Sequence, residues 1–214
     1  MSAPRRSVLD AAAARMTGAR RVGIDGVDGA GKTVFADELA EVLRASGQLV
    51  VRVSADGFHH PRAVRYRRGR DSPQGFWLDS YDLDRLRHDV LDPFGPGGSG
   101  RYRDAAHDVE SDAAMNVAWR NAPEGAVLVL DGLFLHRDEL VDAWDVSIFL
   151  DVPFAVSVPR VARRDGTEPD PTHPSVTRYV QGNKRYFAAC APWDRATVVV
   201  DNSDLAHPHI TALR

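Results

Sequence analysis

The sequence predicts an α/β protein with a doubly wound, mainly parallel sheet of five strands and helices on both faces. Short apolar runs alternate with helical patterns along the chain, which is the order that parallel strands with crossover helices require. Two later runs are apolar without interruption, as expected for strands that are buried on both faces. A chain of 214 residues with 43% hydrophobic content is long enough to bury one such core.

The first 20 residues predict a helical extension before the sheet. They have the pattern of an amphipathic helix, and we expect its cap near Ser7. Asp10 and Arg15 interrupt the apolar positions, so the segment lacks the apolar run of a signal peptide. No later segment approaches the roughly twenty apolar residues that span a bilayer. We therefore expect a cytoplasmic protein with no membrane partner.

The first half of the sheet is expected around one helix. Residues 20–26 and 48–55 have the pattern of strands, and the helix between them covers residues 32–47. The segment 57–123 is irregular, with one helix over residues 82–94 and a glycine-rich stretch after it. We expect this segment to be an insert in the α/β fold.

The second half of the chain repeats the strand and helix alternation without a sequence repeat. Strands are predicted over residues 126–132, 145–152 and 196–202. Helices are predicted over residues 152–165 and 175–190. These elements complete the five-stranded sheet.

Composition excludes several classes of function. The formal net charge is -3, and the mixed charges give no general basic field that would hold nucleic acid or an anionic membrane. The single cysteine, Cys190, excludes an internal disulfide and a multi-cysteine zinc site, and fits a reducing cytosol. Lys32 and Lys184 are the only lysines among 27 basic residues, which makes the surroundings of each informative.

The strongest chemical signal is GVDGAGKT, residues 26–33, which fits the pattern GxxxxGK[ST]. It follows a predicted strand and opens a predicted helix, where backbone N–H groups surround phosphate oxygens. Lys32 would contact the β- and γ-phosphates, and the Thr33 hydroxyl would bind Mg²⁺. A glycine-rich turn with a solvated lysine is the alternative. The predicted nucleotide site comprises Gly26, Val27, Asp28, Gly29, Ala30, Gly31, Lys32 and Thr33.

Three aspartates are expected at the carboxyl edge of the sheet, where ligands of open parallel sheets bind: Asp28, Asp56 and Asp131. Asp131 ends an apolar strand and precedes Gly132, which is typical of an acid that holds Mg²⁺ directly or through water. A turn formed by Asp-Gly is the alternative for Asp56 and for Asp131. A P-loop indicates a nucleotide but leaves the reaction open.

From about residue 21 onward, the order of the motifs resembles the uridine kinase family and its wider group with phosphoribulokinase and pantothenate kinase. The P-loop is followed by a strand with DGFH, a glycine- and proline-rich stretch, RYRDAAHD, VLDG and PRVARRD. The resemblance implies a P-loop NTPase fold, with residues 21–214 as a single kinase domain and residues 57–123 as its acceptor-binding insert. It is also compatible with a homo-oligomer.

The resemblance assigns roles to individual residues. Asp56 would stand beside the nucleoside 5′-hydroxyl as the base and as a neighbour of Mg²⁺, which gives Thr33, Asp56 and Asp131 as the magnesium set. Tyr102 and His107 match the family's substrate contacts. Asp104 stands where an aromatic residue is expected, and this departure bears on the preference for a nucleobase.

The family's acidic contact to ribose hydroxyls falls on Asp79, with Asp82 as the alternative. The stretch GFWLDSYDLDRL is also similar to a stretch of pantothenate kinases, in which the matching acid would be Asp82. A helix N-cap at Ser80 or Asp82 is the structural alternative, and capping does not exclude ligand contact.

Three arginines in the predicted helix 152–165 resemble those of the family's lid, which here would span residues 160–175. Arg160 and Arg164 would stabilise charge on the transferring phosphoryl group, and Arg163 would contact the nucleotide. A solvated helix face is the alternative for these residues.

His59 and His60 follow Asp56 directly. Adjacent residues of an extended chain point to opposite sides, and no HxxxH or cysteine partner lies nearby, so a transition-metal site is not expected. Either ring could contact the acceptor, and we assign that role to His59.

Together these features predict an ATP- and Mg²⁺-dependent kinase for a small-molecule hydroxyl, with the 5′-hydroxyl of uridine or cytidine as the acceptor. A kinase of the same architecture for pantothenate or a sugar is the second hypothesis. A P-loop switch or regulatory ATPase without a metabolite acceptor is the hypothesis from another class. The insert over residues 57–123 favours an acceptor pocket over a switch.

Overall fold

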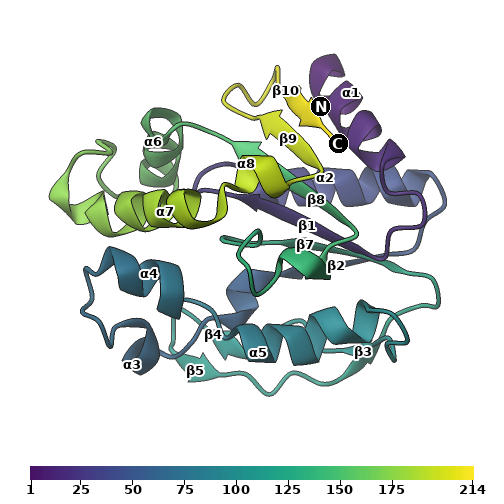
Figure 1. The fold of residues 1–214 in the computed structure, drawn as a ribbon, viewed down its shortest axis with the longest axis horizontal. Coiled ribbons are helices and arrows are strands. Elements are labelled where there is room, and N and C mark those ends of the chain that lie inside the picture. Colours follow the sequence, from purple (N-terminus) through teal and green to yellow (C-terminus); the bar gives the residue numbers. More distant parts are fainter.

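Five parallel strands form the centre of the sheet in the computed structural model, which describes residues 1–214 (Figure 1). The strand order is β9-β8-β1-β7-β2, so β2 and β7 lie on one side of β1, and β8 and β9 lie on the other. The predicted doubly wound α/β fold is therefore confirmed. The five predicted strands are β1 (Arg21–Gly26), β2 (Val50–Ser54), β7 (Val127–Asp131), β8 (Val146–Asp151) and β9 (Val198–Asp201).

The complete sheet has six strands, so the predicted number of five was wrong. The sixth strand, β10 (His209–Leu213), pairs antiparallel with β9 at the edge of the sheet. Its residues alternate between exposed and half-buried, because an edge strand presents one face to solvent. This short alternation lacks the continuous apolar run by which the buried strands were found.

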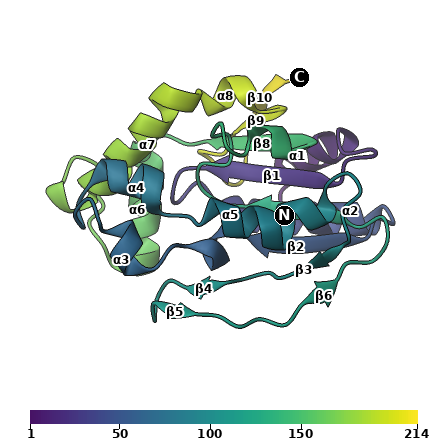
Figure 2. The same ribbon diagram turned by 60° about the horizontal axis from the view of Figure 1, so that its bottom comes forward.

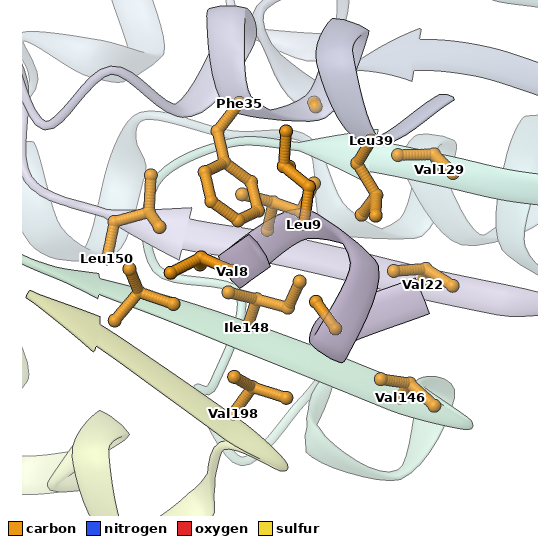
Figure 3. Close-up of a cluster of buried hydrophobic side chains, with 14 of the residues drawn as sticks. Val8, Leu9, Val22, Phe35, Leu39, Val129, Val146, Ile148, Leu150 and Val198 are labelled. Carbon is orange, nitrogen blue, oxygen red and sulfur yellow. The ribbon is translucent and has the colours of Figure 1, made fainter. Parts of the chain in front are cut away.

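Helices α1 (Ala3–Ala14) and α2 (Lys32–Ala45) cover one face of the sheet, and a first core lies between them and the strands (Figure 3). Leu9 of α1 packs in this core with Phe35 and Leu39 of α2, and all three are fully buried. Burial of such a side chain contributes about 1.5–3 kcal/mol to stability. The N-terminal helix therefore shares the main core of the molecule.

The start of α1 differs from the prediction that placed its cap near Ser7. The helix begins at Ala3, and the hydroxyl of Ser2 caps it by accepting a hydrogen bond from the N–H of Arg5. Pro4 is compatible with this earlier start, because a proline in the first turn of a helix removes an N–H that would have no helical partner.

The opposite face of the sheet carries a second core beneath the insert. Val127 and Val129 of β7 belong to the first core, whereas Leu128 and Leu130 belong to the second. This alternation follows from the twofold period of a strand and explains why β7 is apolar throughout. The carboxyl ends of the five strands lie at one edge of the sheet, because these strands are parallel.

The insert consists of short helices and one antiparallel arm (Figure 2). The elements are α3 (Arg62–Arg65), α4 (Pro73–Asp79), α5 (Leu83–Leu86), β3 (Arg101–Tyr102), β4 (His107–Asp108), β5 (Ala113–Ala114) and β6 (Arg120–Asn121). In the arm, β3 pairs with β6 and β4 pairs with β5. Each of these two pairs joins strands of two residues, which is too short for a sequence period. The helix predicted over residues 82–94 is present. It begins as α5 and continues as a π-helical turn at Arg87–Leu91 and a 3-10 turn at Asp92–Phe94.

Helices α6 (Phe154–Asp165) and α7 (Thr177–Cys190) lie close to each other near the P-loop end of the sheet (Figure 1), and the short α8 (Pro192–Arg195) leads into β9. Both longer helices were predicted, and α6 continues through Pro159. None of the helices has the length and apolar character needed to cross a membrane.

Candidate active site

The P-loop connects β1 to α2 and is packed against two other segments. Gly29 and Gly31 have φ angles of +76° and +89°, which favour glycine. A Cβ on Gly29 would collide with the carbonyl oxygen of Ser157 in α6. A Cβ on Gly31 would lie 3.1 Å from the side-chain nitrogen of Asn202. The loop therefore needs these glycines for its backbone conformation and for its close packing.

Lys32 begins α2, and its Nζ donates a hydrogen bond to the carbonyl oxygen of Val27 at 3.0 Å. The Lys32 side chain therefore lies along the P-loop. The free N–H groups at the N-terminus of α2 and the Lys32 ammonium face the same region, which is the arrangement that binds phosphate groups.

Thr33 and Asp131 lie together at the carboxyl end of β7. The Thr33 hydroxyl donates to Oδ2 of Asp131 at 2.8 Å, and Nη2 of Arg52 donates to Oδ1 at 3.0 Å. Asp131 is the last residue of β7 and is only 2% exposed, so the turn alternative does not describe it. A hydroxyl beside a carboxylate fits Mg²⁺, which takes few protein ligands and keeps phosphate and water oxygens.

Asp56 lies in a 3-10 turn, Ala55–Phe58, directly after β2. Its Oδ1 accepts a hydrogen bond of 2.9 Å from the hydroxyl of Tyr81, which is buried. Burial and then the charge of Asp56 raise the pKa of Tyr81 well above its ordinary value, so the phenol keeps its proton and remains a donor. The turn thus presents Asp56, and Tyr81 orients its carboxylate.

His59 packs against the same tyrosine. The two rings are 4.5 Å apart between centroids, and Nδ1 of His59 lies 2.9 Å from the carbonyl oxygen of Asp56. Burial lowers the pKa of His59, so its imidazole is neutral at neutral pH. His60 has different surroundings, with its ring 3.9 Å from Asp82. The two histidines therefore have separate partners.

Asp28 brings a further carboxylate to this region from within the P-loop. Its Oδ2 is shielded from solvent and has no hydrogen-bond partner. Burial raises the pKa of Asp28; Lys32 opposes this shift, and the charge of Asp56 adds to it. The pKa of Arg164 is raised first by its hydrogen bond to Asp165 and further by the charges of Asp28 and Asp56. Two carboxylates and one guanidinium therefore share one electrostatic environment.

A cavity of about 460 Å³ lies beside Asp28. The P-loop forms one wall, and α6 and α7 form the others. Its lining combines apolar and aromatic side chains with polar and charged ones, and such a mixture can bury a small molecule and orient it. The polar and aromatic groups that converge on it include Asp28, Ser157, Arg164, Tyr179 and Asn183.

The three arginines predicted for the lid have different environments. Arg160 donates to the carbonyl oxygens of Gly29, Asn202 and Ser203, which ties α6 to the P-loop and to the segment after β9. Arg163 is exposed. Arg164 lines the cavity and is paired with Asp165. In this conformation Arg164 is therefore the arginine placed to meet a ligand.

None of the five predicted substrate residues, His59 included, lines this cavity. Asp79 is buried and paired with Arg67 and Arg68 in the connection between α3 and α4. Asp82 caps α5 by accepting from the N–H of Arg85 at 3.0 Å, which is the capping alternative of the sequence analysis.

Tyr102 and His107 lie deeper in the insert. Tyr102 packs edge-on against Phe94 in the second core, at 5.4 Å between ring centroids. Nε2 of His107 lies 3.3 Å from Asp112, which also pairs with Arg65. Their contact with an acceptor stays a prediction.

A buried network behind the P-loop was missed by the sequence reasoning. The carboxylate of Asp25, the residue before the P-loop, accepts hydrogen bonds from the N–H of Phe134, the Nδ1 of His136 and the hydroxyl of Tyr186. These partners come from the segment after β7 and from α7, more than 100 residues away in the chain. The network fixes the base of the P-loop against a helix of the cavity wall.

The fold and these motifs define a P-loop kinase. The model of the phosphoribulokinase and uridine kinase family matches residues 22–202, and the chain belongs to this family. The matched range includes the P-loop, Asp56, Asp131 and the arginines of α6, and it excludes α1 and β10.

Relatives and solved structures vary in their substrates. A thymidylate kinase of Xylella fastidiosa (strain 9a5c) is 32% identical over 174 residues, covering 78% of this chain and 76% of that protein. A possible uridine kinase from Bacillus stearothermophilus has a TM-score of 0.70 at 22% identity and covers 91% of this chain and 97% of its own.

Two further structures share the fold at lower similarity. A putative fructose transport system kinase from Silicibacter sp. has a TM-score of 0.66 at 24% identity, with coverage of 85% and 94%. A D-glycerate 3-kinase from Cryptococcus neoformans var. grubii has a TM-score of 0.61 at 11% identity, with coverage of 98% and 100%. At these identities the likeness defines the fold and leaves the acceptor open.

Proposed function

We propose that this protein transfers the γ-phosphoryl group of ATP to a hydroxyl of a neutral small molecule, with the 5′-hydroxyl of uridine or cytidine as the first acceptor to test. The observation that carries the proposal is the carboxylate of Asp56. It is oriented by Tyr81 at the carboxyl end of β2, and it acts electrostatically on Asp28 of the P-loop.

The donor would bind along the P-loop. Backbone N–H groups at the start of α2 and the ammonium of Lys32 would hold the phosphates. Thr33 and Asp131 would hold Mg²⁺, which neutralises charge on the phosphate oxygens when bound. Asp56 would be a neighbour of that ion.

The acceptor would be placed between Asp56 and the cavity. Asp56 accepts the proton of the attacking hydroxyl, and the alignment of that hydroxyl matters more than the strength of the base, because the transition state is loose. His59 as a neutral ring and the cavity residues Tyr179 and Asn183 supply contacts to the rest of the acceptor. Arg164 would meet the transferring group.

The charges at this site favour a hydroxyl over a phosphate as the acceptor group. Asp28 and Asp56 are both carboxylates, and an anionic acceptor beside them would be repelled. Arg164 offsets part of this charge but is already paired with Asp165. The arrangement therefore supports a neutral acceptor, although one relative is a thymidylate kinase.

An assay of ADP release across candidate acceptors tests the proposal. Uridine and cytidine should stimulate ADP release, whereas thymidine monophosphate should not. If only a sugar, glycerate or pantothenate stimulated ADP release, the protein would still be a kinase, but that compound would replace the nucleoside as its acceptor. Stimulation by none of them would favour a regulatory ATPase.

The variant Asp56→Asn tests the role of the carboxylate. It should lower acceptor-dependent turnover by about 10²- to 10⁴-fold, as expected for loss of a general base, while the Kd for ATP stays the same. Asp71→Asn is the matched control, because Asp71 is exposed in the insert that follows Asp56. Unchanged turnover in Asp56→Asn would remove Asp56 from the mechanism.

A further inference from the structure

Helix α1 lies outside the range matched by the family, yet one of its side chains reaches the P-loop region. Arg5 is only 5% exposed. Its Nε donates to Glu38 of α2 at 2.5 Å, and its Nη1 donates to Oδ1 of Asn202 at 3.1 Å and to the carbonyl oxygen of Leu205 at 3.4 Å. One guanidinium group thus joins three segments that are distant in the sequence.

Asn202 carries this connection to the P-loop. Its side chain is fully buried, and its Nδ2 donates to the carbonyl oxygen of Ala30 at 2.7 Å. Arg160 holds the same segment from the other side, through the carbonyl oxygens of Asn202 and Ser203. Residues 202–205 are therefore fixed between α1, α6 and the P-loop.

The segment presents an apolar surface beside the nucleotide site. Leu205 is 47% exposed, and one of its methyl carbons lies 3.6 Å from the position of a Cβ on Gly31. An exposed leucine next to a phosphate-binding loop is suited to pack against the flat, apolar face of a nucleotide base. Arg5 and Arg160 bond the backbone of residues 202–205, and the Leu205 side chain stays exposed.

Arginine is suited to this position for a geometric reason. Its planar group presents several N–H donors in fixed directions, so Glu38, Asn202 and Leu205 can be bonded at the same time. A lysine would keep the charge opposite Glu38 but could not reproduce this fork of donors. The ion pair and the positioning of residues 202–205 can therefore be separated by substitution.

We propose that Arg5 is a positioning residue of the donor site, which holds residues 202–205 as a wall against which the purine base of ATP packs. This inference rests on the proposed function, because it requires ATP as the donor. It gives α1, which precedes the family domain, a role in nucleotide affinity.

The test compares Arg5→Lys and Arg5→Ala with Arg6→Ala. Arg6 is exposed on the same helix and pairs only with Asp10, so its variant controls for the loss of a positive charge from α1. For each purified full-length protein, the measurements are Tm, the Kd for ATP, the KM for ATP, the KM for the acceptor and kcat.

Both Arg5 variants should raise the Kd and KM for ATP by about tenfold, the size expected for loss of a charged hydrogen bond. The kcat at saturating ATP and the KM for the acceptor should stay within about twofold of the unchanged protein, and Arg6→Ala should match it throughout. Arg5→Lys keeps the inference testable if Arg5→Ala does not fold, because it retains the charge opposite Glu38.

Two results would overturn the inference in distinguishable ways. A lower Tm in Arg5→Lys with an unchanged Kd for ATP would show that Arg5 serves stability alone. Failure of the unchanged protein to bind ATP would instead overturn the proposed function, and this inference with it.

Discussion

The proposed donor half and the proposed acceptor half of this site are built differently. The donor half uses a contiguous stretch, residues 26–33, and adds Asp131 from a neighbouring strand end. The proposed acceptor half combines Asp56, which Tyr81 bonds, with the cavity that the P-loop, α6 and α7 form. Where backbone N–H groups do most of the binding, a local motif suffices. Where side chains do it, distant segments must meet.

The two halves also differ in charge. Lys32 and the N-terminus of α2 make the donor half attractive to phosphates. Asp56 of the acceptor half and Asp28 of the P-loop make the region between the two halves negative, with Arg164 as a partial counterion. The positive field would attract an anionic donor, and the negative field would disfavour an anionic acceptor. Substitutions in the two halves should therefore change different kinetic constants.

The largest effect is expected in the donor half. Lys32→Ala removes the P-loop ammonium and should lower kcat/KM by about 10³-fold or more, because the transferring group loses a preorganised charge. The steady-state rate of ADP release measures it. Lys184→Ala is the matched control, because Lys184 is exposed on α7 and is the only other lysine. Equal losses in both variants would contradict a specific role for Lys32.

A smaller effect is expected from the group that orients the base. Tyr81→Phe removes the hydrogen bond to Asp56 and should lower kcat by about tenfold, while the Kd for ATP stays unchanged. Tyr66→Phe is the control, because Tyr66 packs against Arg178 through its ring and would keep that contact. If Tyr81→Phe changed the Kd for ATP and left kcat unchanged, Tyr81 would act on the donor half and not on the acceptor half.

The smallest effect is expected on stability, from Asp28→Asn. Because burial raises the pKa of Asp28 above 3.8 in the folded protein, the folded state binds a proton more readily than the unfolded state. The unsubstituted protein therefore loses stability as pH rises from that value through the raised pKa. Asn is neutral, so the variant should have a Tm a few degrees higher at pH 7, at about 2–4 °C per kcal/mol.

The advantage of Asp28→Asn should disappear as the pH falls below 3.8, where Asp28 is protonated in both the folded and the unfolded state. Thermal unfolding of both proteins at several pH values measures this, with the exposed Asp71→Asn as the control. A variant that is less stable at pH 7 would show that the carboxylate of Asp28 is favourably bonded rather than strained.

The sequence predicted the elements whose signal is local. Continuous apolar runs identified β7 and β8, and the glycine pattern identified the P-loop, because strand burial and positive φ angles restrict residue type position by position. The edge strand β10 and the two-residue strands of the insert carry no comparable period. The family match then confirmed the kinase fold but not the acceptor.

The same contrast holds within the site. Thr33 and Asp131 were found as separate motifs, and the structure joins them by a hydrogen bond. Tyr81, by contrast, had no signal beyond being one aromatic residue in the insert, although it bonds Asp56. Arg5 belonged to a helix with no assigned role.

The sequence by itself determined that this chain forms a doubly wound α/β fold with a phosphate-binding loop, because periodicity and glycine spacing act over a few residues. Only the tertiary structure decided which side chains meet at the sheet edge. The hydrogen bonds of Asp25 to Tyr186 and of Arg5 to Asn202 join residues 161 and 197 positions apart, and no local pattern encodes such distances. Their geometry exists only once both cores have packed.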